Sequence, residues 1–297
     1  MVLKNGKTLI SEEEALDLIK DDMTIAIGGF ITSHHPMSIL RGIAKRKIKN
    51  LMIIGSLSAS FEVDILIGCG CVKKLAAAYV GAESVAPIGP FFKSAMENGK
   101  LELWECDEII LAAQLQASAF DLPFFPVRGG LGTDLPVLNP DLKEFTDPIK
   151  KEKLLAVPAK RIDIAITHAS QADERGNVQY SGNSYLDVLM SRAADVTITS
   201  VEKIVPTEFI RKDPFKTAYR ADYVLKAPFG SHPFSSHGFY REDEQFLGEY
   251  GLLAYAATKG EDSGWIEFKE KYIDKPREHF EYLEQVGIRR LFSLDEF

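Results

Sequence analysis

The stretch "DDMTIAIGGF", residues 21–30, decides the fold, because its apolar run from Met23 to Ile27 ends abruptly in two glycines. A short continuous apolar run bounded by turn residues is typical of a strand buried on both faces of a sheet. A capping box at Ser11–Glu14 predicts a helix before this strand, and Pro36 predicts the start of another helix after it. The strand is therefore expected to lie between two helices.

The same alternation of apolar runs and helical patterns continues along the chain. We expect further strands at 51–55, 73–81, 101–105, 124–127, 162–168, 195–201 and 222–228. Helices are expected at 61–68, 88–97, 107–120 and 184–193, with a polar loop at about 136–153 and mostly helix over about the last 45 residues. Alternating strands and helices predict an α/β fold with an open, mainly parallel sheet covered by helices on both faces. We expect one domain over residues 1–297.

Composition narrows the classes of function. The 297 residues are 45 % hydrophobic and carry a net charge of −8, which argues against a protein that covers nucleic acid or an anionic membrane. The N-terminus lacks the apolar run of a signal peptide, and no segment offers about 18 uninterrupted apolar residues, so we expect a cytoplasmic location. Cys69, Cys71 and Cys106 suggest neither a disulfide framework nor a zinc site, and no metal is expected.

Residues that follow the strands are the candidates for a site, because parallel sheets bind ligands outside the carboxyl ends of their strands. Gly28 and Gly29 allow a ligand to approach the backbone closely, and free N–H groups there would receive a developing oxyanion. A tight strand–helix turn is the alternative interpretation. The pattern lacks the third glycine of a dinucleotide fingerprint, and the chain has no P-loop, HExxH or GxSxG motif.

The stretch "LELWECDEIILAA" (101–113) sets four carboxylates beside apolar residues. Glu108 is the main catalytic candidate, expected to reach the ligand-binding edge, and Glu105 is a second, weaker catalytic candidate that could equally orient a neighbouring group. Glu102 and Asp107 are expected to be solvated.

Histidines form a further set of candidates. His34 and His35 follow the first strand, where they have either a pocket role or a plain loop role. His232 and His237 have no standard metal-ligand spacing, which favours loop packing or interface contacts.

Several motifs, taken in order, resemble family I coenzyme A transferases. The strand followed by Gly28-Gly29-Phe30 and by Pro36 resembles the signature of the A subunit in this family. Further matches run at 66–75, 122–127, 157–180, 197–205 and 227–240. Together they span nearly the full length and look like the glutaconate-type branch.

The resemblance implies an open α/β subunit that pairs with a homologous B subunit in an α2β2 or larger assembly. Its implied substrates are acyl-CoA thioesters and carboxylic acids, with no permanently bound cofactor. The active site would lie between the subunits, and the nucleophilic glutamate would belong to the B subunit. Gly28, Gly29 and Phe30 of this chain would then contact substrate. Glu202 would approach the boundary between the subunits, without a catalytic role.

The sequence departs from this pattern at two places. His34 stands where the signature normally has glycine. The glutaconate branch also has a neutral amide at the position of Glu108 and no arginine at that of Arg128, whereas steroid ring-opening CoA hydrolases have a glutamate and an arginine. The segment "PVRGGLGTD" (126–134) resembles the hydrolase branch, and its Gly129 and Gly130 would either cradle an acyl or carboxylate oxygen or form a simple turn.

Glu108 and Arg128 make a physically reasonable pair. Burial raises the pKa of a carboxyl group and a nearby guanidinium lowers it, which leaves an ionised but poorly hydrated base or nucleophile. The two side chains would meet if strands 101–105 and 124–127 were parallel; a purely structural ion pair is the alternative.

Three interpretations of the function result. The first is a CoA-transferase A subunit, and the second is the A subunit of an acyl-CoA ring-opening hydrolase that uses Glu108 and Arg128. The third is a non-catalytic half that binds acyl-CoA or a partner. We place transfer first, because a carboxylate in this chain does not exclude a nucleophile in the partner.

Overall fold

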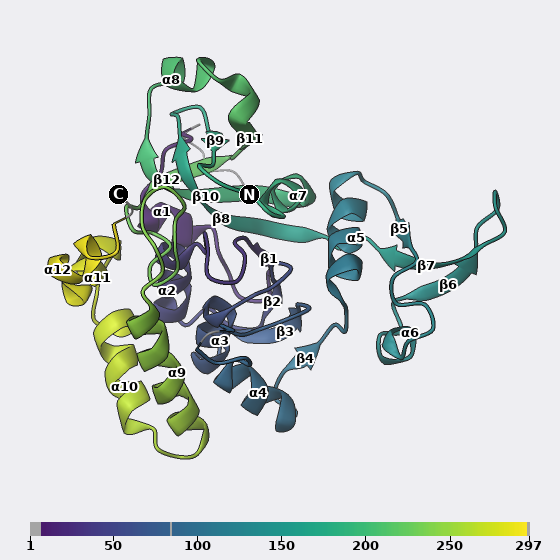
Figure 1. The fold of residues 1–297 in the computed structure, drawn as a ribbon, viewed down its shortest axis with the longest axis horizontal. Helices are drawn as coiled ribbons and strands as arrows, with labels where there is room; N and C mark the ends of the chain where they lie inside the picture. Colours follow the sequence, from purple (N-terminus) through teal and green to yellow (C-terminus); the bar gives the residue numbers. More distant parts are fainter. Residues whose placement is uncertain (1–6, 84, 296–297) are drawn as a thin grey trace.

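The computed structural model describes residues 7–83 and 85–295 (Figure 1). A nine-stranded sheet forms the centre of the described chain. Its strands are β1 (Thr24–Ile27), β2 (Leu51–Ile54), β3 (Val72–Ala76), β4 (Glu102–Leu103), β8 (Ile162–Ala172), β9 (Asn177–Gln179), β10 (Ala194–Ile204), β11 (Thr217–Arg220) and β12 (Tyr223–Lys226).

Most of this sheet is parallel. The order β12-β10-β8-β1-β2-β3-β4 joins strands that all run in one direction, and only β9 and β11 add antiparallel pairs beside β8. This confirms the predicted open, mainly parallel α/β fold.

One face of the sheet carries the larger core. Ile25, Ile53, Leu75 and Ile166 point into it and pack against the N-terminal and C-terminal helices. These helices are α1 (Glu12–Asp17), α2 (Met37–Arg46), α3 (Phe61–Gly68), α4 (Pro90–Glu97), α9 (Glu244–Thr258), α10 (Ser263–Lys269), the π-helical turn η2 (Glu270–Asp274) and α11 (His279–Val286). The predicted capping box at Ser11 and Glu14 is confirmed at the start of α1.

The opposite face packs against fewer helices. Ala26, Ile54, Ala76 and Ala165, which alternate with the residues of the larger core, lie in a cluster with α5 (Glu108–Ala119) and α7 (Asp187–Ala193). Period-two alternation sends successive side chains to opposite faces, so the central strands β1, β2, β3 and β8 are covered on both sides. Shorter elements complete the body at α8 (Thr207–Arg211), the 3-10 turn η1 (Pro214–Lys216) and α12 (Ile288–Phe292).

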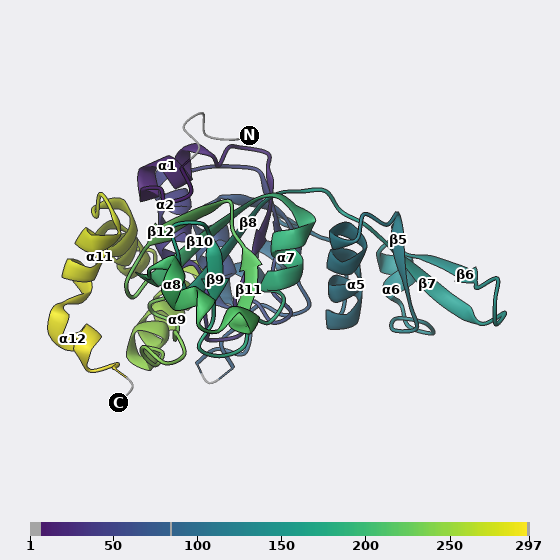
Figure 2. The same ribbon diagram turned by 90° about the horizontal axis from the view of Figure 1, so that it is seen from above.

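A second, three-stranded antiparallel sheet extends from the body, in the order β5-β7-β6. We use the name "arm" for residues 108–158, which hold α5, β5 (Phe124–Val127), α6 (Leu135–Leu138), β6 (Lys143–Thr146) and β7 (Lys153–Pro158). Figures 1 and 2 both show α5 standing between the body and this small sheet. None of the described helices is long and apolar enough to cross a membrane.

The arm corrects two expectations. Strand 124–127 does form, but it belongs to the small antiparallel sheet rather than to the parallel one. The segment 136–153, which was expected to be a polar loop, contains most of α6 and the strand β6. Strand β6 forms because it pairs with β7, and its own sequence has no alternation of apolar residues that would have predicted it.

Candidate functional site

The chain order reverses between β1 and β8. Strands proceed from β1 to β4 in one direction across the sheet, whereas β8, β10 and β12 lie in the other. The carboxyl ends of strands on either side of such a reversal form the crevice where open parallel sheets bind ligands. Two loops meet there: the Ser235 N–H donates to the Thr32 carbonyl (2.8 Å), and the His34 N–H donates to the Ser235 carbonyl (2.8 Å).

The two glycines after β1 do not have free N–H groups. The Gly28 N–H donates to the Ile166 carbonyl (2.9 Å), and the Gly29 N–H donates to Asp187 Oδ1 (3.1 Å). The expected reason for substrate binding, two free donors that receive an oxyanion, is therefore wrong for this conformation. A Cβ on Gly28 would lie 2.5 Å from Asp187 Oδ1, so glycine is needed there for close packing.

Phe30 continues the glycine loop. Its N–H donates to the Ser33 carbonyl (2.9 Å), and its ring stacks on Tyr185 with centroids 4.8 Å apart. Both aromatic side chains are half-buried, so they offer a surface to a ligand at the edge of the crevice.

Asp187 fixes the glycine loop from α7. Its Oδ2 accepts a hydrogen bond from the Tyr180 hydroxyl (2.6 Å), and burial raises the pKa of its carboxyl group to about 7. Neither residue was among the sequence candidates. Nothing local in the sequence indicated this contact, because Asp187 lies more than 150 positions away from Gly29 in the chain.

His35 packs against the same glycine loop. A Cβ on Gly29 would lie 2.5 Å from His35 Nδ1, and the His35 ring also contacts the Ile31 carbonyl through Nε2 (3.0 Å). His35 Nδ1 lies 3.4 Å from Oε1 of Glu62, and both side chains are fully buried. Burial lowers the pKa of His35 to about 4 and raises that of Glu62 to about 8, so burial favours the neutral form of each group.

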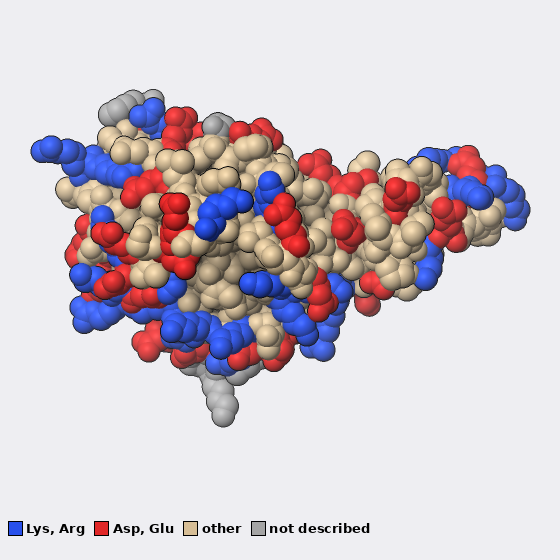
Figure 3. Space-filling model, turned by 90° about the horizontal axis from the view of Figure 1, so that it is seen from below, with Lys and Arg blue, Asp and Glu red and all other residues tan. Residues whose placement is uncertain are grey.

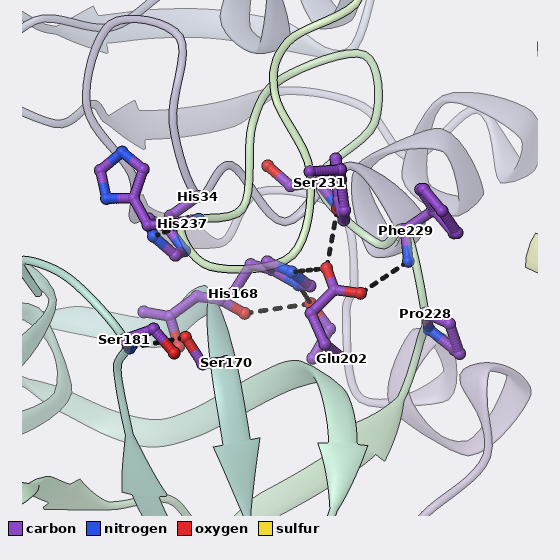
Figure 4. Close-up of polar contacts among 12 residues, drawn as sticks. His34, His168, Ser170, Ser181, Glu202, Pro228, Phe229, Ser231 and His237 are labelled. Atoms are coloured by element: carbon purple, nitrogen blue, oxygen red, sulfur yellow. Dashed lines mark hydrogen bonds and ion pairs between the residues drawn. The ribbon is translucent and has the colours of Figure 1, made fainter. Parts of the chain in front are cut away.

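His34 points into a cluster of polar side chains (Figure 4). Its backbone has φ = +59°, which is strained for a residue with a Cβ and which glycine would adopt without strain. Its Nε2 accepts the His237 N–H (3.3 Å), so the neutral ring carries its proton on Nδ1. That buried N–H has no acceptor among the described residues, and burial, followed by His168, His237 and His35, lowers the pKa of His34 well below 6.5.

Glu202 lies deeper in the same cluster. Its Oε1 accepts hydrogen bonds from His168 Nε2 (2.7 Å) and the Tyr240 hydroxyl (2.7 Å), and its Oε2 accepts one from the Phe229 N–H (2.7 Å). Figure 4 shows His168 and Phe229 on two sides of the carboxylate. With three donors and almost no exposure, Glu202 holds β10 against the 228–240 loop.

Glu108 lies at a different part of the same edge. It is the first residue of α5, and its exposed carboxylate accepts a hydrogen bond from the Ser58 hydroxyl (3.2 Å). Ser58 belongs to the loop after β2, and its carbonyl accepts the Ile31 N–H (2.8 Å) from the loop after β1. The structure therefore brings Glu108 to the carboxyl ends of the strands, beside the glycine loop.

The other three carboxylates of 101–113 are not equivalent. Glu102 is exposed, as expected, and Glu105 is half-buried with its carbonyl accepting a hydrogen bond from Asn139 Nδ2 (2.8 Å). Asp107 was expected to be solvated, but it is half-buried and caps α5 by accepting the Ile110 N–H at Oδ1 (2.7 Å). This cap fixes the start of the helix and therefore the position of Glu108.

Arg128 does not pair with Glu108 in this structure. Its guanidinium donates to Glu152 instead, and both side chains are largely exposed. The expectation that two parallel strands would bring Glu108 and Arg128 to one end is wrong, because β5 pairs antiparallel with β7 in the other sheet.

The glycines after Arg128 nevertheless approach α5. A Cβ on Gly129 would lie 3.2 Å from Ile109 Cγ2, and one on Gly130 would lie 3.0 Å from Ile110 Cδ1. The segment therefore packs against the first turn of α5, next to Glu108. Gly130 also has φ = +84°, which glycine adopts without strain.

No group of three or more His, Cys, Asp or Glu side chains in residues 7–83 and 85–295 has the geometry to hold a metal ion. Cavities of about 550 Å³, between α1, α2 and residues 272–282, and of about 810 Å³, between α4 and α9, lie away from the candidate residues.

Comparisons with known proteins agree with this geometry. Residues 10–220 match the coenzyme A transferase family. The chain is 32 % identical to the A subunit of glutaconate CoA-transferase of Acidaminococcus fermentans over 91 % of this chain and 88 % of the relative. It is also 32 % identical to the cholesterol ring-cleaving hydrolase IpdA subunit of Mycobacterium tuberculosis, over 88 % of this chain and 91 % of the relative.

A further relative, an uncharacterized protein of Archaeoglobus fulgidus, is 34 % identical over 98 % of this chain, which spans 66 % of that protein. Among solved structures, glutaconate coenzyme A-transferase from Acidaminococcus fermentans superimposes with a TM-score of 0.91 and 29 % identity, covering 98 % of this chain and 96 % of the other. The chain belongs to the coenzyme A transferase family.

Proposed function

We propose that the chain is the A subunit of a heteromeric enzyme that transfers coenzyme A between carboxylic acids. The observation that carries this proposal is the agreement with the glutaconate enzyme over almost the whole length of both chains. Several relatives are named as the A subunit of a CoA-transferase, which supports a partner B subunit here, in an α2β2 or larger assembly. The acyl-CoA thioester is then a substrate rather than a resident cofactor.

The proposed chemistry proceeds through the partner. On the B subunit, a glutamate carboxylate attacks the thioester carbonyl, which forms an acyl–glutamyl anhydride and releases the CoA thiolate. The thiolate then attacks the glutamyl carbonyl, which forms an enzyme-bound glutamyl–CoA thioester and frees the first carboxylic acid. The same steps in reverse load the acceptor acid, so no water, oxidant or reductant is consumed.

In this scheme the present chain binds and orients substrate. Phe30 with Tyr185 and the Gly129–Gly130 segment border the edge where Glu108 lies, and we assign substrate contacts to this border. Gly28 and Gly29 contribute through shape, because their small size lets Asp187 and His35 pack behind the loop. Glu105 would act on Glu108 by positioning the segment before α5.

The test is whether the reaction needs an acceptor acid. The complex of both subunits is incubated with an acyl-CoA, with and without a second carboxylic acid, and the CoA species are separated by chromatography. We expect a new acyl-CoA only when the acceptor is present, with total thioester conserved. Free CoA that accumulates equally with and without acceptor would contradict transfer.

Ring-opening hydrolysis is the second candidate, and Glu108 is the observation that favours it. A carboxylate held by Ser58 at the carboxyl edge is suited to activate water, and the IpdA relatives are named hydrolases. Arg128 would have to leave Glu152 to assist it.

Glu108→Gln separates the two candidates. The amide keeps the size of the side chain but loses its basicity, so hydrolysis through Glu108 should fall by about 100-fold or more. Under transfer, turnover should change by less than about tenfold. Glu102→Gln is the matched control, because this exposed carboxylate lies in the same segment.

A further inference from the structure

The small sheet of the arm has one face that packs and one that does not. Phe125, Val127, Leu155 and Val157 lie in one cluster with the buried residues of α5. Because side chains alternate along a strand, their neighbours in sequence face the opposite way, away from α5. Figures 1 and 2 show the small sheet beyond α5, on the side away from the body.

The outer face is apolar. The pairing register places Phe124 beside Pro158, Pro126 beside Ala156, and Phe145 beside Leu154. The rings of Phe124 and Phe145 lie 5.5 Å apart, across the small side chain of Ala156. Each of these six residues is exposed or only half-buried. A sheet with one face in water normally alternates apolar and polar residues, but β7, "KLLAVP", is apolar on both faces.

Apolar exposure continues along the arm to the candidate site. Val137 and Leu138 of α6 are 81 % and 61 % exposed, and Ile149 at the β6–β7 turn is 87 % exposed. Ile109, next to Glu108, is 58 % exposed. Large apolar side chains that gather at the surface of one part of a protein indicate an interaction site.

We propose that the outer face of the arm sheet is the docking surface for the B subunit. The inference rests on the proposed function, because the partner is the second subunit that the family relationship requires. Docking there would join the partner to the arm, whose helix α5 begins with Glu108.

The lysines of the arm argue against a second copy of this chain as the molecule that binds to the outer face. Lys143 lies on the outer face beside Ala156, and Lys150 and Lys151 lie at the β6–β7 turn. The acidic residues of this turn, Asp147 and Glu152, already accept hydrogen bonds from the turn backbone and from Arg128. Figure 3 shows blue side chains at the free end of the arm, with red ones beside them. A twofold contact brings the same patch against itself, so these lysines would face their own copies. The complementary surface is an apolar patch with an acidic rim, carried by a different chain.

The test uses the complex purified from native cells through a tag on this chain. The B subunit is identified by peptide mass spectrometry as a second coenzyme A transferase chain, and its affinity is then measured with purified subunits. Phe124→Lys with Leu154→Lys should weaken the complex by about 100-fold or more, because it places charges at the centre of the interface. Phe215→Lys is the matched control, since Phe215 is 99 % exposed on η1 in the body and should leave affinity unchanged.

A second measurement tests the same surface without the double variant, which could lose affinity simply because it does not fold. A photoreactive benzoylphenylalanine at position 124 keeps an aromatic ring there, and illumination should link it to the B subunit. Wild-type affinity of the double variant, cross-links only to a second copy of this chain, or a wild-type chain that retains no coenzyme A transferase B subunit would each overturn the inference. A complex that assembles through this face but transfers no CoA would instead refute the proposed function alone.

Discussion

Glu62 and His35 lie fully buried beneath the glycine loop and have opposite pKa shifts. The folded-state pKa of Glu62, about 8, is above the usual value of 4.5. Its contribution to stability is therefore complete below pH 4.5 and is lost as the pH rises through 8, because the folded state must then hold a buried charge.

Glu62→Gln should remove this loss. We expect the free energies of unfolding of variant and wild type to be similar near pH 4.5, and the variant to be more stable by on the order of 5 kcal/mol near pH 9. Urea unfolding at a series of pH values measures the difference, with Glu102→Gln as the exposed control. A difference that stays constant between these pH values would show that Glu62 is already ionised in the folded protein.

The location of a site residue could be predicted from the sequence only where the residue directly follows a predicted strand. Glu108 and the glycines follow strands, so sequence alone brings them to the right edge of the sheet. No local pattern predicts Asp187 or Glu62, because they contact Gly28, Gly29 and His35 only in the folded chain. The Glu108–Arg128 pair failed as a prediction because it depended on the pairing of two distant strands.

Asp107 controls the start of α5, and with it the position of Glu108. Asp107→Ala leaves the Ile110 N–H without its acceptor and should lower the free energy of unfolding by about 1 kcal/mol. Asp107→Asn keeps an oxygen that can accept this hydrogen bond, so it should lower the free energy of unfolding by only about 0.3 kcal/mol. Thermal unfolding of both variants measures the effect, and equal stabilities of the two would show that the cap contributes nothing.

Strands of the parallel sheet were predictable, as were α5 and β5 of the arm, whereas α6, β6 and β7 were not. Strands β1, β2, β8 and β10 are buried on both faces, so each forms an apolar run in the sequence. Strand β6 is short and mostly polar, and it exists because it pairs with β7. Pairing between distant segments leaves no period in either segment, which is why the sequence predicted a loop in the arm.

The whole molecule is a body that holds the candidate site at its sheet edge and an arm that extends beyond it. The Nδ1–H of His34 lacks an acceptor among the described residues, Glu108 is exposed, and the outer face of the arm is apolar. All three features fit a chain that completes its site together with another subunit. Sequence motifs predicted this dependence through the family resemblance, whereas the docking face emerged only from the register of the small sheet.

The location of the covalent intermediate tests the central claim most directly. The assembled enzyme is incubated with its acyl-CoA and then with tritiated borohydride, which reduces a glutamyl–CoA thioester to an alcohol and labels that residue. We predict tritium on one glutamate of the B subunit, loss of activity in proportion to labelling, and no label on this chain. Label at Glu108, or full transfer activity with no label on either chain, would contradict the account.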